Sequence, residues 1–431
     1  MKTFFFSGAV FLSIAAAAQT MPLYDCIQQA VAHNYAIKIV HNQKDVAENN
    51  VTYTPFMPGI TASGTQNQAY SVGSRTLATT NEQTDIEAKA NNLNAGVALN
   101  WRLFDGLAMF ATYHKQKEAL NVSEQEVKIA MENLIAQVCY EYYNIIILNN
   151  RLSAAQYSLT LSQERYQQAM EMYTLGSSSG LDLRQAKIDF NADSSVLMTQ
   201  QEALQNAYIR LNTLMNAPLT NQGYVYDSIS LLAKIDRQQL YEATLKYNST
   251  LTAARLGKCI AEQDLKIARA LRYPTLNFNT GYNYSWAETP SSAVTYNRSS
   301  GFNWGFSLSW TLFDGFDVRR RIQNAKLSVT GSELSYLQIE NNIQSELALV
   351  YNTYETNLLK INFETESVET AYQTLDAAMS RYKLGGLSGI EFREYQKNYL
   401  EAVERQLSAT YQAKLSEITL RLMSGELITG L

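Results

Sequence analysis

The hexapeptide WRLFDG at residues 101–106 returns as WTLFDG at residues 310–315, an offset of 209 positions. The same offset relates YTLGSSSG at residues 173–180 to YKLGGLSG at residues 382–389. An offset that stays constant over so long a stretch indicates a duplication whose intervening element tolerates no insertion. A continuous helix has this property. We therefore expect two tandem repeats, each built around one long helix.

The stretch between the two motifs has the pattern of an uninterrupted helix. Residues 107–175 contain neither Gly nor Pro, the two strongest helix breakers. Their apolar residues recur at alternating steps of four and three, and Glu141 and Ser162 are the only polar residues along this seam. The period predicts coiled-coil helices over 106–174 and 315–383, each roughly 100 Å long at about 1.5 Å per residue.

Shorter helical segments complete each repeat. A turn rich in glycine follows each long helix, and a second helix is expected to run back at 182–216 or 391–425, which makes two helical hairpins. Helices at about 24–51 and 240–271 open the repeats. Both stop near a proline, which favours extended backbone before it and so predicts a switch from helix to strand.

Four strands are predicted from alternating side chains. Residues 275–288, 300–313 and 92–104 alternate apolar or aromatic side chains with small or polar ones, whereas 59–72 alternate only weakly. An aromatic face opposite a polar face is typical of an outer-membrane barrel wall, although an ordinary sandwich with one solvated face alternates similarly. Because a membrane barrel needs about eight strands, four per chain require oligomers, with eight strands in a dimer or twelve in a trimer.

The N-terminus has the features of an export signal. Lys2 precedes an apolar run of 15 residues, 4–18, whose last three alanines supply small residues for cleavage. This run is shorter than a spanning helix, and no later segment approaches about 18 consecutive apolar residues. The expected organisation is a signal peptide at 1–18, a repeat at 19–219, a linker at 220–236 and a second repeat at 237–431.

Composition excludes several classes of function. With 46% hydrophobic residues the chain is not disordered, and its charge of 35 minus 40, or -5, provides no basic surface for nucleic acid. The three His and three Cys are widely separated, so neither a metal site nor a disulfide framework is expected. No catalytic constellation is present, and residues 176–180 lack the Lys and Ser/Thr of a phosphate loop. We expect neither an enzyme nor a cofactor.

The order of elements in each half resembles that of the TolC-type outer membrane efflux proteins. Helix, proline, strand hairpin, Phe-Asp-Gly, long helix, Leu-Gly turn and return helix follow one another twice, and LNTLMNAPL at 211–219 resembles the leucine-rich close of that family's first half. The resemblance implies an α+β membrane protein: a homotrimer with a twelve-stranded β-barrel in outer-membrane lipid and a helical tunnel in the periplasm of a Gram-negative bacterium. It implies a passive exit duct for tripartite efflux or type I secretion, working with a periplasmic adaptor (membrane fusion) protein and an inner-membrane RND or ABC transporter.

The resemblance also implies two sites at the glycine-rich turns. Matching by residue assigns a periplasmic gate to Asp182, Tyr382, Glu391 and Glu394, while Leu387 occupies the position of the family's basic latch. Adaptor docking is implied at Leu175, Gly176, Ser177, Ser178, Leu384, Gly385, Gly386 and Leu387.

Simpler roles are open to the same residues. Asp182 and Glu391 also fit Ser-x-x-acid helix starts, and the glycines also serve to reverse the chain. In a trimer, Glu391 and Glu394 bring six carboxylates to one mouth, where repulsion is expected to raise their apparent pKa and to favour bound cations.

One alternative function and one open question accompany this interpretation. An exported coiled-coil stalk or adhesin without channel activity also explains the heptads and the signal peptide, but it does not require aromatic strand hairpins at equivalent positions in both halves. Within the channel class, small hydrophobic compounds, metal ions and polypeptides all remain possible cargo, because the inner-membrane partner selects the substrate.

Overall fold

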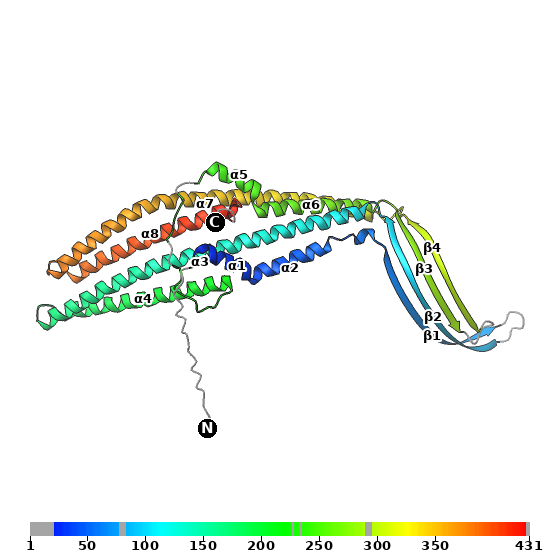
Figure 1. The fold of residues 1–431 in the computed structure, drawn as a ribbon, viewed down its shortest axis with the longest axis horizontal. Helices are drawn as coiled ribbons and strands as arrows, with labels where there is room; N and C mark the ends of the chain where they lie inside the picture. The colour runs from blue at the N-terminus through cyan, green and yellow to red at the C-terminus, as the bar shows by residue number, and fades with distance from the viewer. Residues whose placement is uncertain (1–20, 77–82, 226–227, 233–234, 289–294, 428–431) are drawn as a thin grey trace, which may run out of the picture. The chain divides into compact units, whose positions relative to one another are not determined.

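The computed structural model describes residues 21–76, 83–225, 228–232, 235–288 and 295–427, so the signal peptide predicted at 1–18 lies outside the described residues. Figure 1 shows the same series of elements twice along the chain. In order they are α1 (Leu23–His33), α2 (Tyr35–Asn50), the 3-10 helix η1 (Thr54–Phe56), β1 (Gly59–Thr76), β2 (Gln83–Phe104), α3 (Ala108–Thr174), α4 (Gly180–Met215), α5 (Arg237–Tyr247), α6 (Ser249–Ala270), β3 (Thr275–Glu288), β4 (Tyr296–Ser309), α7 (Asp317–Lys383) and α8 (Gly389–Met423).

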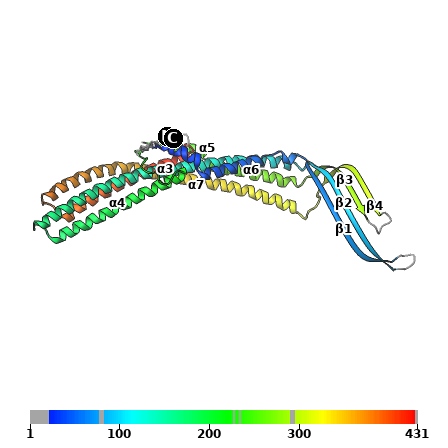
Figure 2. The same ribbon diagram turned by 60° about the horizontal axis from the view of Figure 1, so that its bottom comes forward.

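These elements form two compact units. The first comprises Met1–Asn42, Gln125–Thr252 and Gln338–Leu431, and it contains α4 and α8 together with the parts of α3 and α7 that follow residues 124 and 337. The second comprises Gln43–Glu124 and Ala253–Leu337, and it contains the sheet. Within the first unit, α4 lies alongside α3 and α8 alongside α7, as Figures 1 and 2 both show.

The long helices α3 and α7 have 67 residues each. Both begin two residues later than predicted, because the Phe-Asp-Gly motif is their capping segment. A side-chain oxygen of Asp105 accepts a hydrogen bond from the Met109 N–H at 3.1 Å, and Asp314 accepts one from the Val318 N–H at 2.7 Å. Each motif therefore ends a strand and starts a helix.

An asparagine divides each of the helical segments predicted at 24–51 and 240–271 into two helices. Asn34 and Asn248 have extended backbone, with ψ of 130° and 120°. The Asn34 amide donates to the Leu214 carbonyl at 3.0 Å, and the Asn248 amide donates to that of Met423 at 3.0 Å. Each asparagine caps the following helix and binds the end of a return helix, so a tertiary contact decides the break.

The sheet is antiparallel, with strand order β1-β2-β3-β4. The hairpin of β1 and β2 extends beyond the predicted 59–72 and 92–104, because polar residues that carry no apolar pattern continue the pairing. β4 ends at Ser309 rather than at residue 313: Ser309 pairs with Thr275, where β3 begins, and the preceding Pro274 has no N–H to continue the ladder.

The predicted alternation within β4 is confirmed. Its large apolar side chains share one face and are all more than half exposed in the chain: Phe302 69%, Trp304 66%, Phe306 62% and Leu308 69%. Polar residues on the other face bond across the strands, as in the hydrogen bond from Asn279 to Ser307 at 3.1 Å.

The core of the first unit lies where α1 meets α3 and α4. Cys26, Cys139, Tyr142, Ile145 and Leu211 are each at most 1% exposed there. Burial raises the pKa of both the Cys26 and the Cys139 thiol to about 12, so these cysteines are packed as small apolar residues.

Candidate functional site

Both hairpin turns have the same helix-ending geometry. Gly176 and Gly385 have a φ of +75°, which favours glycine. In the first turn the Gly176 N–H bonds to the Tyr173 carbonyl at 3.0 Å and the Ser177 N–H to the Met172 carbonyl at 2.9 Å. The second turn repeats both bonds, so both are Schellman turns that reverse the chain.

Aliphatic side chains are exposed to solvent at both turns. Leu175 is 82% exposed and Leu384 is 87% exposed. Leu181 and Ile390, in the first turns of the return helices, are 73% and 76% exposed, and the sequence interpretation had not included them. The other residues predicted for docking divide as follows: Gly176, Ser177, Gly385 and Gly386 are exposed, whereas Ser178 and Leu387 are half-buried.

Two of the predicted gate acids, Asp182 and Glu391, bond to the serines that cap their helices. Oδ2 of Asp182 accepts hydrogen bonds from the hydroxyls of Ser179 at 2.8 Å and Ser178 at 3.1 Å. Oε2 of Glu391 accepts from the Ser388 N–H at 2.9 Å and from its hydroxyl at 2.7 Å, in a capping box.

The capping hydrogen bonds favour the charged form of both acids in the single chain. The hydrogen bonds from Ser179 and Ser178 hold the pKa of Asp182 below its usual range, and those from Ser388 do the same for the pKa of Glu391. The raised apparent pKa expected of six carboxylates concerns the trimer and stays a prediction.

The remaining gate residues lie in different surroundings. Glu394 is exposed on α8, one turn after Glu391. Tyr382 is only 9% exposed, and its ring stacks on Phe392 with centroids 5.4 Å apart. Burial raises the pKa of Tyr382. The structure thus places Tyr382 in the core of the second hairpin and the acids on its surface.

A buried polar cluster joins the two hairpins, and sequence reasoning missed it. Asp193 on α4 accepts hydrogen bonds from Ser158 and Ser162 on α3. It also pairs with both terminal nitrogens of Arg393 on α8, at 2.7 and 2.8 Å. Gln396, which is fully buried, donates to the Ser158 carbonyl at 2.9 Å. We call these five residues the Asp193 cluster.

The surroundings of Asp193 stabilise its charged form. Burial by itself would raise the pKa of this carboxyl, but the hydrogen bonds from Arg393 and Ser162 outweigh burial and hold the pKa below its usual range. A bidentate guanidinium contact of this kind fixes distance and orientation together. The cluster therefore sets how α8 packs against α3 and α4.

A second buried ion pair lies closer to the turns. Arg165 on α3 is 1% exposed and pairs with Asp189 on α4. Its Nη1 also donates to the carbonyl of Gly389, the first residue of α8, at 3.1 Å. The start of α8 is thus bound to the first hairpin at two levels.

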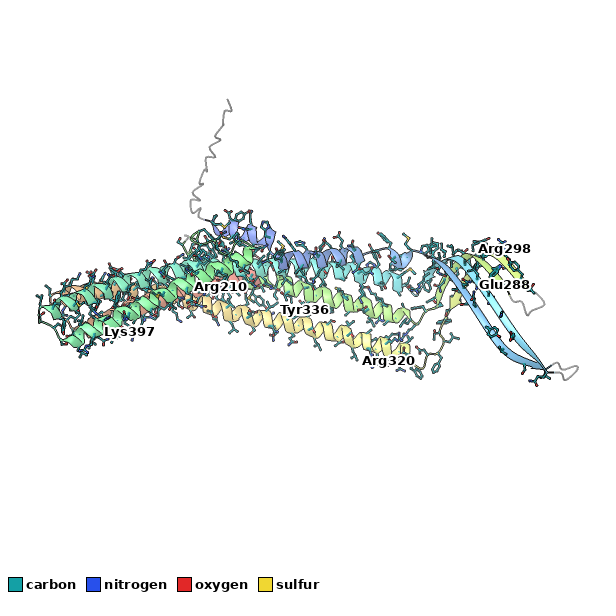
Figure 3. All side chains as sticks on the ribbon, turned by 90° about the horizontal axis from the view of Figure 1, so that it is seen from below. Arg210, Glu288, Arg298, Arg320, Tyr336 and Lys397 are labelled. Carbon is teal, nitrogen blue, oxygen red and sulfur yellow. The ribbon has the colours of Figure 1, made fainter. Side chains whose placement is uncertain are left out.

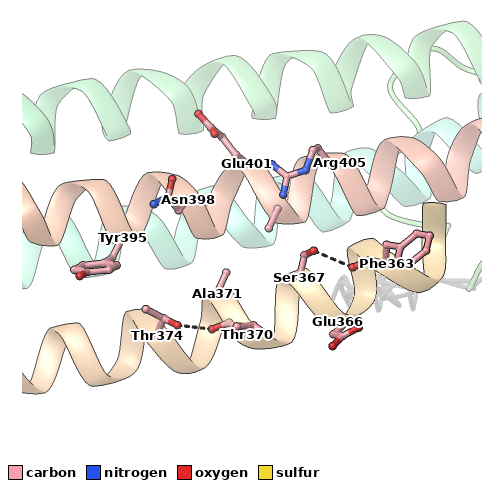
Figure 4. Close-up of a pocket in the computed structure, with 11 residues that line it drawn as sticks. Phe363, Glu366, Ser367, Thr370, Ala371, Thr374, Tyr395, Asn398, Glu401 and Arg405 are labelled. Carbon is pink, nitrogen blue, oxygen red and sulfur yellow. Dashed lines mark hydrogen bonds between the residues drawn. The ribbon is translucent and has the colours of Figure 1, made fainter.

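A groove of about 610 Å³ lies between α7 and α8 (Figure 4). Ser367 and Thr374 in its wall donate to the carbonyls of Phe363 and Thr370 in their own helix, and Arg405 pairs with Glu364. Over the described ranges, no group of three or more His, Cys, Asp or Glu side chains could hold a metal ion. No helix in that part of the chain is long and apolar enough to cross a membrane.

The profile of a known family matches both halves of this chain. It is described as "Outer membrane efflux protein", and it matches residues 26–217 and 240–426. The chain belongs to the outer membrane efflux protein family. Membership makes it a passive outer-membrane channel, the exit duct of an efflux or type I secretion system, which lies in the outer membrane and extends into the periplasm.

Individual members of the family are distant in sequence. The outer membrane protein TolC of Vibrio cholerae is 19% identical over 360 residues, which cover 80% of either protein. The proteases secretion protein PrtF of Dickeya chrysanthemi is 19% identical over 418 residues, or 95% of this chain and 89% of PrtF. The crystal structure of the Campylobacter jejuni CmeC outer membrane channel aligns with a TM-score of 0.78 at 16% identity, over 94% of this chain and 86% of CmeC. This efflux protein therefore has the helix-rich α+β channel fold.

Proposed function

We propose that three copies of this efflux protein close a twelve-stranded barrel in the outer membrane. The observation that carries the proposal is the open four-stranded sheet, in which β1 and β4 are the edges. An unpaired strand edge is not tolerated in lipid, so each edge needs a partner strand. Since successive strands are antiparallel, β4 of one copy meets β1 of the next in antiparallel orientation. Pairing between copies extends the same pattern around the ring.

Native mass spectrometry of the detergent-solubilised protein tests this assembly. We expect a trimer, because two copies supply only the minimum of about eight strands and leave no room for a wide tunnel. The twelve-stranded ring is also what the family resemblance implies. A monomer or a dimer as the main species would contradict the proposal.

The same trimer supplies the duct below the membrane. The two repeats of each copy contribute the hairpins α3-α4 and α7-α8, and six hairpins side by side form the periplasmic tunnel. Cargo is driven by an inner-membrane RND or ABC transporter and reaches the duct through a periplasmic adaptor. The family is named for efflux and PrtF for protease secretion, so the duct itself does not define the cargo.

We place adaptor docking on the two hairpin turns. Leu175, Leu181, Leu384 and Ile390 support this, because aliphatic side chains between 73% and 87% exposed are costly to leave in water and gain most from being covered. The two turns have equal backbone geometry, so a trimer offers six similar surfaces.

We place an acidic gate at Glu391 and Glu394 on the first two turns of α8. The double substitution Glu391→Gln with Glu394→Gln is expected to abolish the block of planar-bilayer conductance by divalent cations added on the periplasmic side. Glutamine also serves in a capping box, so this change removes charge while it leaves the helix start intact.

Glu401→Gln is the matched control, since Glu401 lies further along α8 and pairs with Lys397 on its surface. We expect this variant to retain the cation block. Unchanged block in the double variant would overturn the acidic gate. Tyr382→Phe keeps the ring that stacks on Phe392 and tests the hydroxyl separately.

A further inference from the structure

Between β4 and the first turn of α7, the side chains change from apolar to aromatic to cationic. The apolar residues of β4 end at Leu308, and exposed apolar or aromatic residues continue through Trp310 and Leu312 to Phe313 and Phe316, which are 74% and 66% exposed. Asp317 begins α7, and three consecutive arginines follow at once, Arg319, Arg320 and Arg321. Hydrocarbon, aromatic rings and cations in this order correspond to the layers of a membrane leaflet, from acyl chains through the interface to the phosphates.

The exposed residue Phe316 has an unfavourable backbone conformation. Gly315 and Phe316 both have positive φ, of 66° and 68°, a conformation that bulky residues avoid. The ring packs only edge-on against that of Phe313, with centroids 5.5 Å apart. A strained residue whose side chain stays about two thirds exposed indicates a function outside the folded chain.

Two other junctions of the second unit share parts of this arrangement. Leu107 follows Gly106 with a φ of 71° and is 61% exposed, and Phe110 is 50% exposed. Before β3, Tyr273 is 57% exposed and stands next to Arg272. The indole of Trp310 donates to the Arg272 carbonyl at 3.1 Å, which joins the segment before β3 to the segment after β4.

Positive charge at the junctions is only partly neutralised. The twelve residues on the helical side of each strand end (47–58, 105–116, 263–274 and 310–321) hold seven Lys or Arg and five Asp or Glu, or +2 in a chain of -5. Arg320 and Arg321 share the single carboxylate of Asp317, at 2.6 and 2.5 Å. Among the described residues no carboxylate pairs with Arg319.

Three consecutive residues on a helix point in directions about 100° apart. The arginines therefore radiate from the start of α7, so the side that faces lipid carries at least one guanidinium whatever the rotation of the helix. Arg320 is labelled there in Figure 3. Guanidinium groups bind phosphate oxygens in bidentate fashion and are attracted to anionic surfaces.

We propose that this junction belt, Arg272, Phe313, Phe316, Arg319, Arg320 and Arg321, binds anionic phospholipids of the periplasmic leaflet. The two rings lie among the upper acyl chains and the arginines bind the lipid phosphates. The inference rests on the proposed barrel, because the barrel determines which level of the chain meets the leaflet. It adds a lipid class and a binding site to the channel.

Reconstitution of the purified protein into nanodiscs tests the charge half of the proposal. The discs contain phosphatidylcholine with about one third phosphatidylglycerol, and native mass spectrometry counts the lipids that stay bound. The wild type is expected to enrich phosphatidylglycerol. Arg319→Gln, Arg320→Gln and Arg321→Gln together should reduce the enrichment at least about tenfold, because the variant loses three positive charges at one level of the chain.

The matched control removes three positive charges elsewhere: Lys187→Gln, Lys360→Gln and Lys397→Gln, all exposed residues of the helical hairpins. It should leave the enrichment unchanged. An equal loss in the control, or no loss in the arginine variant, would overturn the proposal. Trimers that form without any enrichment would overturn this inference alone, whereas failure to form trimers in any lipid would overturn the barrel and the inference with it.

Phe316→Gly tests the aromatic half. Glycine accepts the positive φ, so the variant should melt at or above the wild-type temperature in detergent. In membranes it should be extracted at a lower detergent concentration, because one ring per copy no longer lies in the interface. Unchanged extraction would show that the ring has no membrane role.

Discussion

Replacing Asp193 with alanine is expected to lower the free energy of unfolding by about 3 kcal/mol and to loosen the two hairpins at the periplasmic end. Asp193 is 5% exposed and is the acceptor that Arg393 and the serines of α3 share. Without it Arg393 is left without its bidentate partner. The estimate is at the low end for a buried ion pair, because the Arg393 side chain is 29% exposed and regains some water.

Thermal unfolding followed by circular dichroism measures the effect, and planar-bilayer conductance reports the looser gate. Glu401→Ala is the matched control: Glu401 pairs with Lys397 on the surface of α8, with exposed fractions of 54% and 62%, and such pairs contribute at most about 1 kcal/mol. If Asp193→Ala melts at the same temperature as Glu401→Ala, the cluster does not hold the hairpins together.

The same carboxylate gives a pH dependence with a defined sign. The folded-state pKa of Asp193 is lowered, so its contribution to stability is fully present above the unfolded value of about 3.9 and is lost as the pH falls through the folded value. Wild type and Asp193→Ala should therefore differ most near neutral pH and converge in acid. A difference that grows below about pH 4 would contradict the assignment.

The long helices and their turns could be predicted because local chemistry determines them. Glycine is favoured at the turns, where Gly176 and Gly385 have a φ of +75°, and a stretch without Gly or Pro continues as a helix. The breaks at Asn34 and Asn248 could not be predicted. Asparagine is a modest helix former, and here its amide bonds to a carbonyl of a helix that lies far away in sequence.

The candidate site likewise has one part that the sequence predicts and one part that it does not. Ser388-x-x-Glu391 can be recognised locally as a capping box, and the structure contains it. One residue of the Asp193 cluster could be noticed in the sequence. Ser162 is, with Glu141, one of two polar residues on the apolar seam of the long helix. Its partners could not be named, because a heptad pattern shows which face of a helix is buried but not which buried charges meet. Asp193 and Arg393 are 200 residues apart.

Phe302→Arg is expected to prevent stable assembly in the outer membrane. Phe302 pairs with Tyr282 near the centre of the hairpin of β3 and β4, and its side chain is 69% exposed in the single chain. An arginine at the bilayer midplane costs about 2 to 4 kcal/mol per site, and a trimer carries three such sites. The measurement is the fraction of heat-modifiable trimer in outer-membrane extracts, which should fall close to zero.

Two arginine substitutions in β4 are the controls for Phe302→Arg: one near the end of the strand and one on its opposite face. Leu308 is one residue from the end of β4, where the cost of arginine falls to about 0 to 1 kcal/mol and the side chain can reach the phosphates, so Leu308→Arg should retain most of the trimer. Ser307→Arg alters the opposite face, where Ser307 accepts a hydrogen bond from Asn279 at 3.1 Å and the barrel lumen is expected. Equal loss in Phe302→Arg and Ser307→Arg would mean that both faces of the sheet are buried in protein, and the barrel would then be excluded.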